Sequence, residues 1–301
     1  MSRVALLPGW LEPPEVDGVQ IVTWDSGEPT PPRSVLDHVE FFVPPYMCPI
    51  SDVAVAAQMP RLRVVQALMA GVDGMAEVVP ADVTVLRAQQ VHDTSTAELA
   101  LGLIIAAQRG IDIAARDMVT GTWGHRRRRS LADSRVGIVG WGGVGRAIAD
   151  RLAPFEVSIT AFSRSGSAGS VPVDSFDEML PDLDVVVLAL PLTMRTRLFM
   201  DSTRLALMAE GALLVNVGRG GLIATDALVS ETASGRIRAA LDVTDPEPLP
   251  PDHPLWGCPG VLITPHIGGN SAAFVPRARA MVAGQLRRLA AGEFDRISPQ
   301  L

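Results

Sequence analysis

The sequence predicts an α/β fold with two domains, each built on a parallel β-sheet. Short apolar stretches alternate with helical or Pro-rich stretches along most of the chain, which is the pattern of parallel sheets. A glycine-rich turn between an apolar strand and a helix lies near the middle, so that about 135 residues precede it. With 301 residues, 48% of them apolar, the chain is long enough for two domains of ordinary size.

The first part of the chain is predicted to form four short strands and then a long helix. The helix begins at about Thr94, where Ser95 and Glu98 have the spacing of a capping box. Its apolar side is broad, which predicts that it is buried between structural units. The four strands are expected at Val4–Leu7, Ile21–Thr23, Val39–Val43 and Arg63–Leu68.

The glycine-rich turn predicts a dinucleotide site. A strand begins at Arg135, and Gly140, Gly142 and Gly145 then fit the pattern G-x-G-x-x-G before a helix over Arg146–Leu152. In such a site the glycines provide a tight turn, room for a pyrophosphate and close packing of helix on strand. The helix N-terminus directs N–H groups and a positive dipole end at phosphate. An ordinary structural turn is the alternative, and the flanking strand and amphipathic helix favour nucleotide binding.

Further strands after the glycine loop predict a doubly wound domain over residues 95–272. The last helix, Phe274–Ala291, lies beyond this domain and is expected to pack against the N-terminal part of the chain, residues 1–94. The predicted domains are therefore residues 1–94 plus 273–301, and residues 95–272. The further strands are expected at Ser158–Phe162, Asp184–Leu190, Ala212–Asn216, Ala239–Val243 and Val261–Thr264.

Composition excludes several functional classes. The net charge of −7 argues against nucleic acid as a partner. Cys48 and Cys258 lie far apart and in no metal-ligand spacing, which predicts a reduced, cytoplasmic protein without a metal. Residues 1–14 lack the apolar run of a signal peptide, and Leu99–Ala107 is too short to span a membrane.

The run Arg126–Arg129 is interpreted as a solvated loop. A basic rim that attracts an anionic substrate is the alternative, and contact with nucleic acid is the weakest interpretation.

The residues that follow the second strand of the doubly wound domain predict the cofactor. An NAD site has Asp or Glu at this position to hold the ribose 2′-hydroxyl, and that carboxylate repels a 2′-phosphate. This chain has Ser163, Arg164 and Ser165 instead. Arginine and serine donate hydrogen bonds that suit a phosphate, so NADP(H) is predicted, with NAD(H) possible. A surface loop without any 2′ contact is the alternative.

Three later segments place reactive side chains after predicted strands, where open α/β sheets bind their ligands. Arg219 stands between glycines in Leu214–Gly221, and its guanidinium can bind a carboxylate. Asp242 and Glu247 follow the next strand. His266 follows the last one, in the sequence Thr264-Pro265-His266.

These motifs, taken in order, resemble the D-isomer-specific 2-hydroxyacid dehydrogenase family over nearly the whole chain. Pro191-Leu192-Thr193 with Thr196-Arg197 resembles the fourth-strand motif of the family, and Asp252–Trp256 before Thr264-Pro265-His266 resembles its last segment. Ser163-Arg164-Ser165 resembles the NADPH-preferring glyoxylate/hydroxypyruvate reductase branch. The resemblance implies a Rossmann nucleotide-binding domain inserted in a smaller, flavodoxin-like parallel α/β substrate domain. It also implies a homodimer in which the segment around residues 99–130 crosses between subunits.

The resemblance assigns three catalytic roles in the interconversion of a small 2-keto acid and a D-2-hydroxy acid. His266 donates a proton to the keto oxygen as hydride arrives, because histidine exchanges protons near neutral pH. Glu247 hydrogen-bonds the imidazole and favours its charged form. Arg219 binds the substrate carboxylate and polarises the carbonyl group.

The resemblance also implies two binding sets. Backbone N–H groups of Ala70, Gly71 and Val72 join Arg219 and His266 in binding substrate, and Tyr46 and Met47 are further candidates for the pocket. Relatives often carry a bulkier residue at the position of Gly143, but the phosphate contact there uses backbone. Asp242 is expected to face the nicotinamide carboxamide. The expected cofactor-binding residues are Thr96, Gly140, Trp141, Gly142, Gly143, Val144, Gly145, Ser163, Arg164, Ser165, Leu190, Pro191, Thr196, Val217, Gly218, Asp242 and Gly268.

Three rival functions share this fold. One is a nucleotide-sensing scaffold similar to the transcriptional corepressors, which keep the Arg–Glu–His set but act through protein partners. Another is an NAD-dependent member such as a phosphoglycerate-type dehydrogenase. Formate dehydrogenase is the third, and it uses Gln where this chain has Glu247, which speaks against it.

Overall fold

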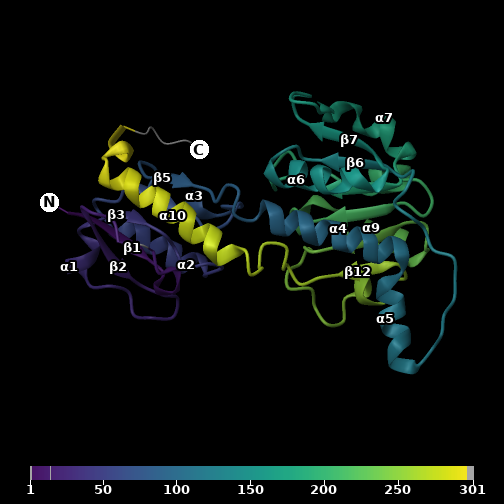
Figure 1. Ribbon diagram of the computed structural model, residues 1–301, viewed down its shortest axis with the longest axis horizontal. Helices are drawn as coiled ribbons and strands as arrows, with labels where there is room; N and C mark the ends of the chain where they lie inside the picture. Colours follow the sequence, from purple (N-terminus) through teal and green to yellow (C-terminus); the bar gives the residue numbers. More distant parts are fainter. Residues whose placement is uncertain (1, 14, 297–301) are drawn as a thin grey trace. The chain divides into compact units, whose positions relative to one another are not determined.

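The computed structural model describes residues 2–13 and 15–296 (Figure 1). Residues 1, 14 and 297–301, which the predicted first domain includes, lie outside the described residues. The chain divides into two compact units. The first unit contains residues 1–92 and 272–301, and the second unit contains residues 93–271.

The first unit is a parallel sheet with helices on both faces. Its five described strands have the order β2-β1-β3-β4-β5, which is the flavodoxin-like order. Side chains of β1 alternate between two cores: Val4 and Leu6 belong to one, and Ala5 and Leu7 to the other. Both faces of the sheet are thus covered, as parallel sheets require. The described elements are β1 (Arg3–Leu7), β2 (Val19–Thr23), α1 (Arg33–Leu36), β3 (Val39–Phe42), α2 (Ile50–Val53), β4 (Val64–Gln66), α3 (Met75–Val78), β5 (Thr84–Leu86) and α10 (Phe274–Ala290), with short 3₁₀ turns at Gly9–Leu11, Ala54–Gln58 and Glu293–Arg296.

The last helix, α10, belongs to the first unit although nearly 190 residues separate it from β5. It buries Ala278, Val282, Leu286 and Leu289 in the core that Ala5 and Leu7 share. Its polar contacts are equally specific, because the Gln285 side chain donates to the Gln66 side chain, 3.1 Å away, at the end of β4. The helix α10 therefore packs on the sheet of the first unit.

The second unit contains seven described strands in the order β12-β11-β10-β9-β6-β7-β8, all parallel. The order reverses between β6 and β9, which is the switch point of a doubly wound Rossmann sheet. The predicted fold class is confirmed. The elements are α4 (Asp93–Arg109), α5 (Ile111–Thr120), β6 (Arg135–Val139), α6 (Gly143–Leu152), β7 (Ser158–Ser163), β8 (Val171–Pro172), α7 (Phe176–Met179), β9 (Val185–Leu188), α8 (Ser202–Leu207), β10 (Leu213–Asn216), α9 (Thr225–Ala233), β11 (Arg238–Leu241) and β12 (Val261–Ile263), with 3₁₀ turns at Ala153–Phe155, Val173–Ser175, Leu180–Asp182, Gly220–Leu222 and Pro254–Gly257.

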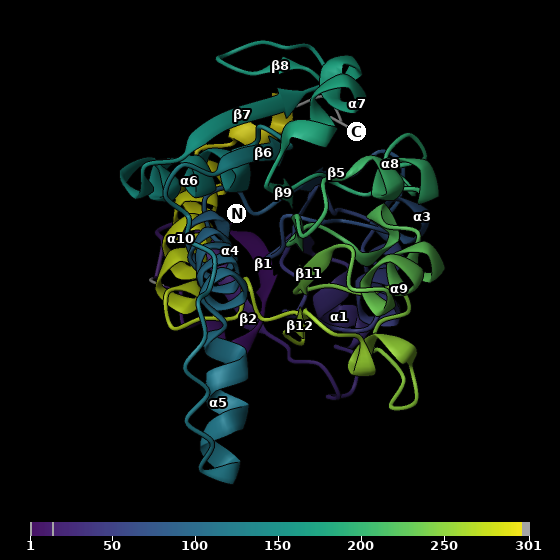
Figure 2. The same ribbon diagram turned by 90° about the vertical axis from the view of Figure 1, so that its right-hand side faces the viewer.

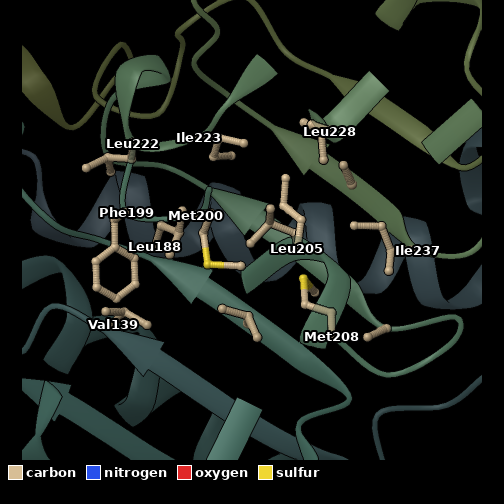
Figure 3. Packing of buried hydrophobic residues seen from close by; sticks show 14 of the residues in the cluster. Val139, Leu188, Phe199, Met200, Leu205, Met208, Leu222, Ile223, Leu228 and Ile237 are labelled. Carbon is tan, nitrogen blue, oxygen red and sulfur yellow. The ribbon is translucent and has the colours of Figure 1, made fainter. Parts of the chain in front are cut away.

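Two apolar cores cover the faces of this sheet. On one face, Val139 of β6 and Leu188 of β9 pack with Phe199, Met200 and Leu205 (Figure 3). On the other face, α4 and α6 pack on neighbouring side chains of the same strands. Burial on both faces holds the carboxyl ends of the strands at one rigid edge, from which the loops with the predicted site residues emerge.

The long helix differs from its predicted form. It begins at Asp93, so Ser95 lies within α4 and the predicted capping box is wrong. The Ser95 hydroxyl instead lies 2.6 Å from the Ser271 hydroxyl, so the side chain joins two distant segments of the second unit. Gly110, at φ 64°, ends α4 and starts α5, which buries none of its residues and projects from the second unit (Figure 2).

Arg129, the last residue of the arginine run, lies at the amino ends of the strands. An ideal Cβ atom on Gly211, just before β10, would lie 2.1 Å from Nη2 of Arg129. Burial and the charge of Arg129 lower the pKa of Arg238 to about 10, which leaves this guanidinium charged at neutral pH. Arg129 is therefore at the edge opposite the glycine loop of its own chain.

Among the described residues, no helix has the length and apolar character needed to cross a membrane.

Candidate active site

The glycine loop connects β6 to α6 at the switch point of the second sheet, and each glycine has its own steric reason. Gly140 has φ 110°, and a Cβ atom there would lie 2.5 Å from the Ala189 carbonyl oxygen. A Cβ atom on Gly145 would lie 1.9 Å from the Gly140 carbonyl oxygen. No atom lies within 4 Å of a Cβ atom placed on Gly142, so the space beside this glycine is open. The loop is tight on the protein side and open on the other, which suits a pyrophosphate.

The loop after β7 is tied to the glycine loop by Trp141. Its indole nitrogen donates to the Ala168 carbonyl oxygen at 2.8 Å. The Ser163 hydroxyl lies 2.7 Å from the Ser170 hydroxyl and accepts from the Gly166 N–H, so this side chain shapes the loop. Arg164 is exposed, with no ion pair or hydrogen bond to any residue that the structure describes. Ser165 is exposed beside it.

The loops after β9 and β10 lie against the glycine loop. A Cβ atom on Gly218 would lie 2.7 Å from the Leu190 carbonyl oxygen, and Val217 is buried. The Thr196 hydroxyl donates to the Pro191 carbonyl oxygen at 2.6 Å, which closes the turn after β9. Predicted cofactor-binding residues from three strands thus converge at one edge of the sheet.

Arg219 is positioned by a residue that the sequence reasoning missed. Asn216 is fully buried at the end of β10; its amide donates to the Arg219 carbonyl oxygen and accepts from the Gly218 N–H. The Arg219 guanidinium, half-buried, donates to the Gly218 carbonyl oxygen at 2.8 Å. An asparagine at a strand end two residues before a glycine is typical of such local side-chain-to-backbone bonds, and this signal was present in the sequence.

Asp242 organises the loop that carries His266. Its carboxylate is 3% exposed and accepts hydrogen bonds from the Thr264 hydroxyl and from the N–H groups of Ile267 and Gly268. These three hydrogen bonds offset much of the free energy that it costs to bury a charged carboxylate away from water. A Cβ atom on Gly268 would lie 3.4 Å from the Thr96 side chain, so Thr96, Asp242 and Gly268 are neighbours.

His266 and Glu247 form a pair. The His266 Nδ1 atom lies 2.5 Å from a Glu247 carboxylate oxygen, and both side chains are partly exposed, by 33% and 40%. The backbone of His266 is left-handed, with φ 52°, and its N–H donates to the Asp242 carbonyl oxygen. With Nδ1 bound to a carboxylate, the Nε2 atom is the ring nitrogen that can exchange a proton with a ligand.

The first unit contains a cavity of about 160 Å³ beside the turn of Ala70, Gly71 and Val72. Of the two further candidates for the substrate pocket, Tyr46 lines this cavity, whereas Met47 is exposed to solvent and is not part of the lining. Burial raises the pKa of Tyr46 above its ordinary value. The full lining is Pro44, Pro45, Tyr46, Cys48, Ile50, Val53, Ala67, Leu68, Met69, Asp73 and Met75.

Cys48 in this cavity is not a nucleophile at neutral pH. Burial, followed by the charge of Asp52, raises the pKa of its thiol to about 11. The thiolate is the reactive form of cysteine, so the side chain acts as a small apolar group.

Comparison with known proteins places the chain in a family. The model of the "D-isomer specific 2-hydroxyacid dehydrogenase, NAD binding domain" matches residues 101–268. Human glyoxylate reductase/hydroxypyruvate reductase is 32% identical over 267 residues, covering 83% of this chain and 81% of the human protein. D-3-phosphoglycerate dehydrogenase of Mycobacterium tuberculosis is 34% identical over 257 residues, or 81% of this chain. This chain spans about half of that relative, 48% of its length.

A solved structure agrees with these matches. The D-isomer specific 2-hydroxyacid dehydrogenase from Xanthobacter autotrophicus Py2, in complex with NADPH and MES, is 28% identical with a TM-score of 0.79. The match covers 97% of this chain and 96% of that protein. The chain therefore belongs to the D-isomer specific 2-hydroxyacid dehydrogenases, a family of oxidoreductases that act on CH–OH groups with NAD(P).

Proposed function

We propose that the protein is an NADP(H)-dependent reductase that converts small 2-keto acids, glyoxylate and hydroxypyruvate among them, into 2-hydroxy acids, D-configured where the product is chiral. The observation that carries this proposal is the bond between His266 and Glu247 on the unit that holds the glycine loop. We assign cofactor binding to residues 95–272 and substrate binding to the domain of residues 1–94 and 273–301.

The residues of the glycine loop fit a dinucleotide, because the side of Gly142 is open where a pyrophosphate needs space. The bound nicotinamide supplies the hydride that reduces the keto carbon. His266 gives the proton on Nε2 to the keto oxygen, and Glu247 at Nδ1 orients the ring and stabilises its charged form. Solvent then restores the proton, so one keto acid, one hydride and one proton yield one hydroxy acid.

Arg219 is assigned to the substrate carboxylate. Its backbone is held at both ends, by Asn216 on one side and by the close approach of Gly220 to the Thr244 carbonyl oxygen on the other. Such fixed placement lets a guanidinium bind a carboxylate in a defined orientation. We also assign substrate binding to the N–H groups of Ala70, Gly71 and Val72 in the first unit.

The proposed reaction predicts NADPH oxidation by the purified protein with a panel of 2-keto acids, including glyoxylate, hydroxypyruvate and a phosphorylated 2-keto acid. We expect turnover with at least one small member. Cofactor binding without turnover of any member would instead favour a nucleotide-sensing scaffold. Turnover restricted to the phosphorylated acid with NADH would favour a phosphoglycerate-type enzyme.

The loop after β7 predicts a preference for NADPH over NADH. The 2′-phosphate is expected to bind Arg164, which is exposed beside two serines and has no carboxylate at the end of β7 to oppose it. Arg164→Ala should raise the KM for NADPH by about 10-fold or more, because hydrogen bonds to charged groups are worth about 1.5–3 kcal/mol. The KM for NADH should stay the same. Arg287→Ala, an exposed arginine on α10, is the matched control, and equal wild-type rates with both cofactors would refute the preference.

The exposed segment after α4 predicts a homodimer. Met118, Val119 and Trp123 are 81%, 88% and 95% exposed, which is a cost for large apolar side chains in water unless a partner covers them. The double variant Met118→Glu/Val119→Glu should shift sedimentation from dimer to monomer. Leu207→Glu, another exposed apolar position, should remain dimeric. A monomeric wild-type protein would exclude this arrangement.

A further inference from the structure

A carboxylate of this chain lies on the first turn of α6, inside the proposed cofactor site. Asp93 is the first residue of α4 and of the second unit, 50 residues before Gly143, at which α6 begins. An ideal Cβ atom on Gly143 would lie 1.9 Å from Oδ2 and 2.7 Å from Cγ of Asp93. The carboxylate therefore occupies the space that any larger residue at position 143 needs. Glycine at this position is what admits Asp93.

The electrostatics of α6 explain why an anion lies there. The first N–H groups of a helix lack backbone partners and form its positive end. Gly142 at the N-cap offers no side chain, and the first turn of α6 contains no acidic residue. Asp93 supplies, from another helix, the negative charge that this turn does not provide for itself. Its side chain is partly exposed to solvent.

The same turn is the proposed site of the cofactor pyrophosphate. We propose that Asp93 is a tethered competitor of the pyrophosphate: it holds the first turn of α6 in the cofactor-free protein and must give way when the dinucleotide binds. The carboxylate thereby weakens cofactor binding and speeds cofactor release. This proposal rests on the cofactor site of the proposed function and identifies in it a residue that sets affinity.

The test is the removal of the charge alone, by Asp93→Asn. The dissociation constants of NADPH and NADH are measured by fluorescence titration, and cofactor release by stopped flow. At low salt we expect both cofactors to bind about 5- to 50-fold tighter, with slower release, because a like charge within a few ångströms is removed. The gain should shrink as salt is raised, since the side chain is partly exposed. Asp150→Asn, an exposed carboxylate at the other end of α6, removes the same charge and should leave affinity unchanged.

Unchanged or weaker binding by Asp93→Asn would overturn the proposal, and weaker binding would mean that the carboxylate itself binds the cofactor. A wild-type protein that binds neither NADPH nor NADH would refute the cofactor site instead, so the two failures are distinct.

Discussion

Replacing His266 with alanine is expected to lower kcat for keto-acid reduction by about 10²- to 10⁴-fold, the usual contribution of a positioned proton donor. The imidazole lies 2.5 Å from Glu247, and its removal takes away the ring nitrogen that we propose as the proton donor. The dissociation constant of the cofactor should stay close to that of the wild type, because the ring is partly exposed and packs no core. Stopped-flow reduction and fluorescence titration measure the two quantities separately.

Two variants sharpen this test. Glu247→Gln keeps a hydrogen-bonding group next to Nδ1 but removes its charge, so kcat should fall less than in His266→Ala. His38→Ala removes an exposed histidine of the first unit and should leave kcat unchanged. Near-normal turnover by His266→Ala would contradict the proton-transfer role.

Gly145→Ala is expected to destabilise the second unit and to abolish cofactor binding. Its Cβ atom would lie 1.9 Å from the Gly140 carbonyl oxygen, and backbone atoms cannot rotate away as a side chain can. Overpacking of a core costs about 1–3 kcal/mol or more, and here the strain falls on the packing of α6 against β6. Calorimetry should show a lower unfolding temperature for the second unit, and titration should show no NADPH binding.

Gly142→Ala is the matched control for this steric argument. Gly142 has φ −84°, which alanine adopts readily, and nothing lies within 4 Å of the added methyl group. This variant should therefore keep the wild-type unfolding temperature and lose affinity only, because the methyl group occupies the open side proposed for the pyrophosphate. If Gly145→Ala folded and bound NADPH normally, the close approach in the glycine loop would be wrong.

Local patterns predicted the strands and helices where the signal was long enough. The strand before the glycine loop was expected from the apolar and small residues that lead into it, and the last helix, expected at Phe274–Ala291, ends at Ala290. Strands β5 and β8 were not predicted; they contain three and two residues, and no long apolar run surrounds them. The capping box at Ser95 failed because α4 begins at Asp93, so that Ser95 lies inside the helix and its hydroxyl lies beside that of Ser271.

The sequence by itself determined the fold class, the family and the order in which reactive side chains follow the strands. Those properties depend on residue type and spacing, which the sequence states directly. Only the tertiary structure decided which distant groups meet: Glu247 with His266, Asn216 around Arg219, and Asp93 on Gly143. Parallel strands bring their carboxyl ends to one edge, so residues tens of positions apart become neighbours there. Those distances arise from packing, and no local pattern contains them.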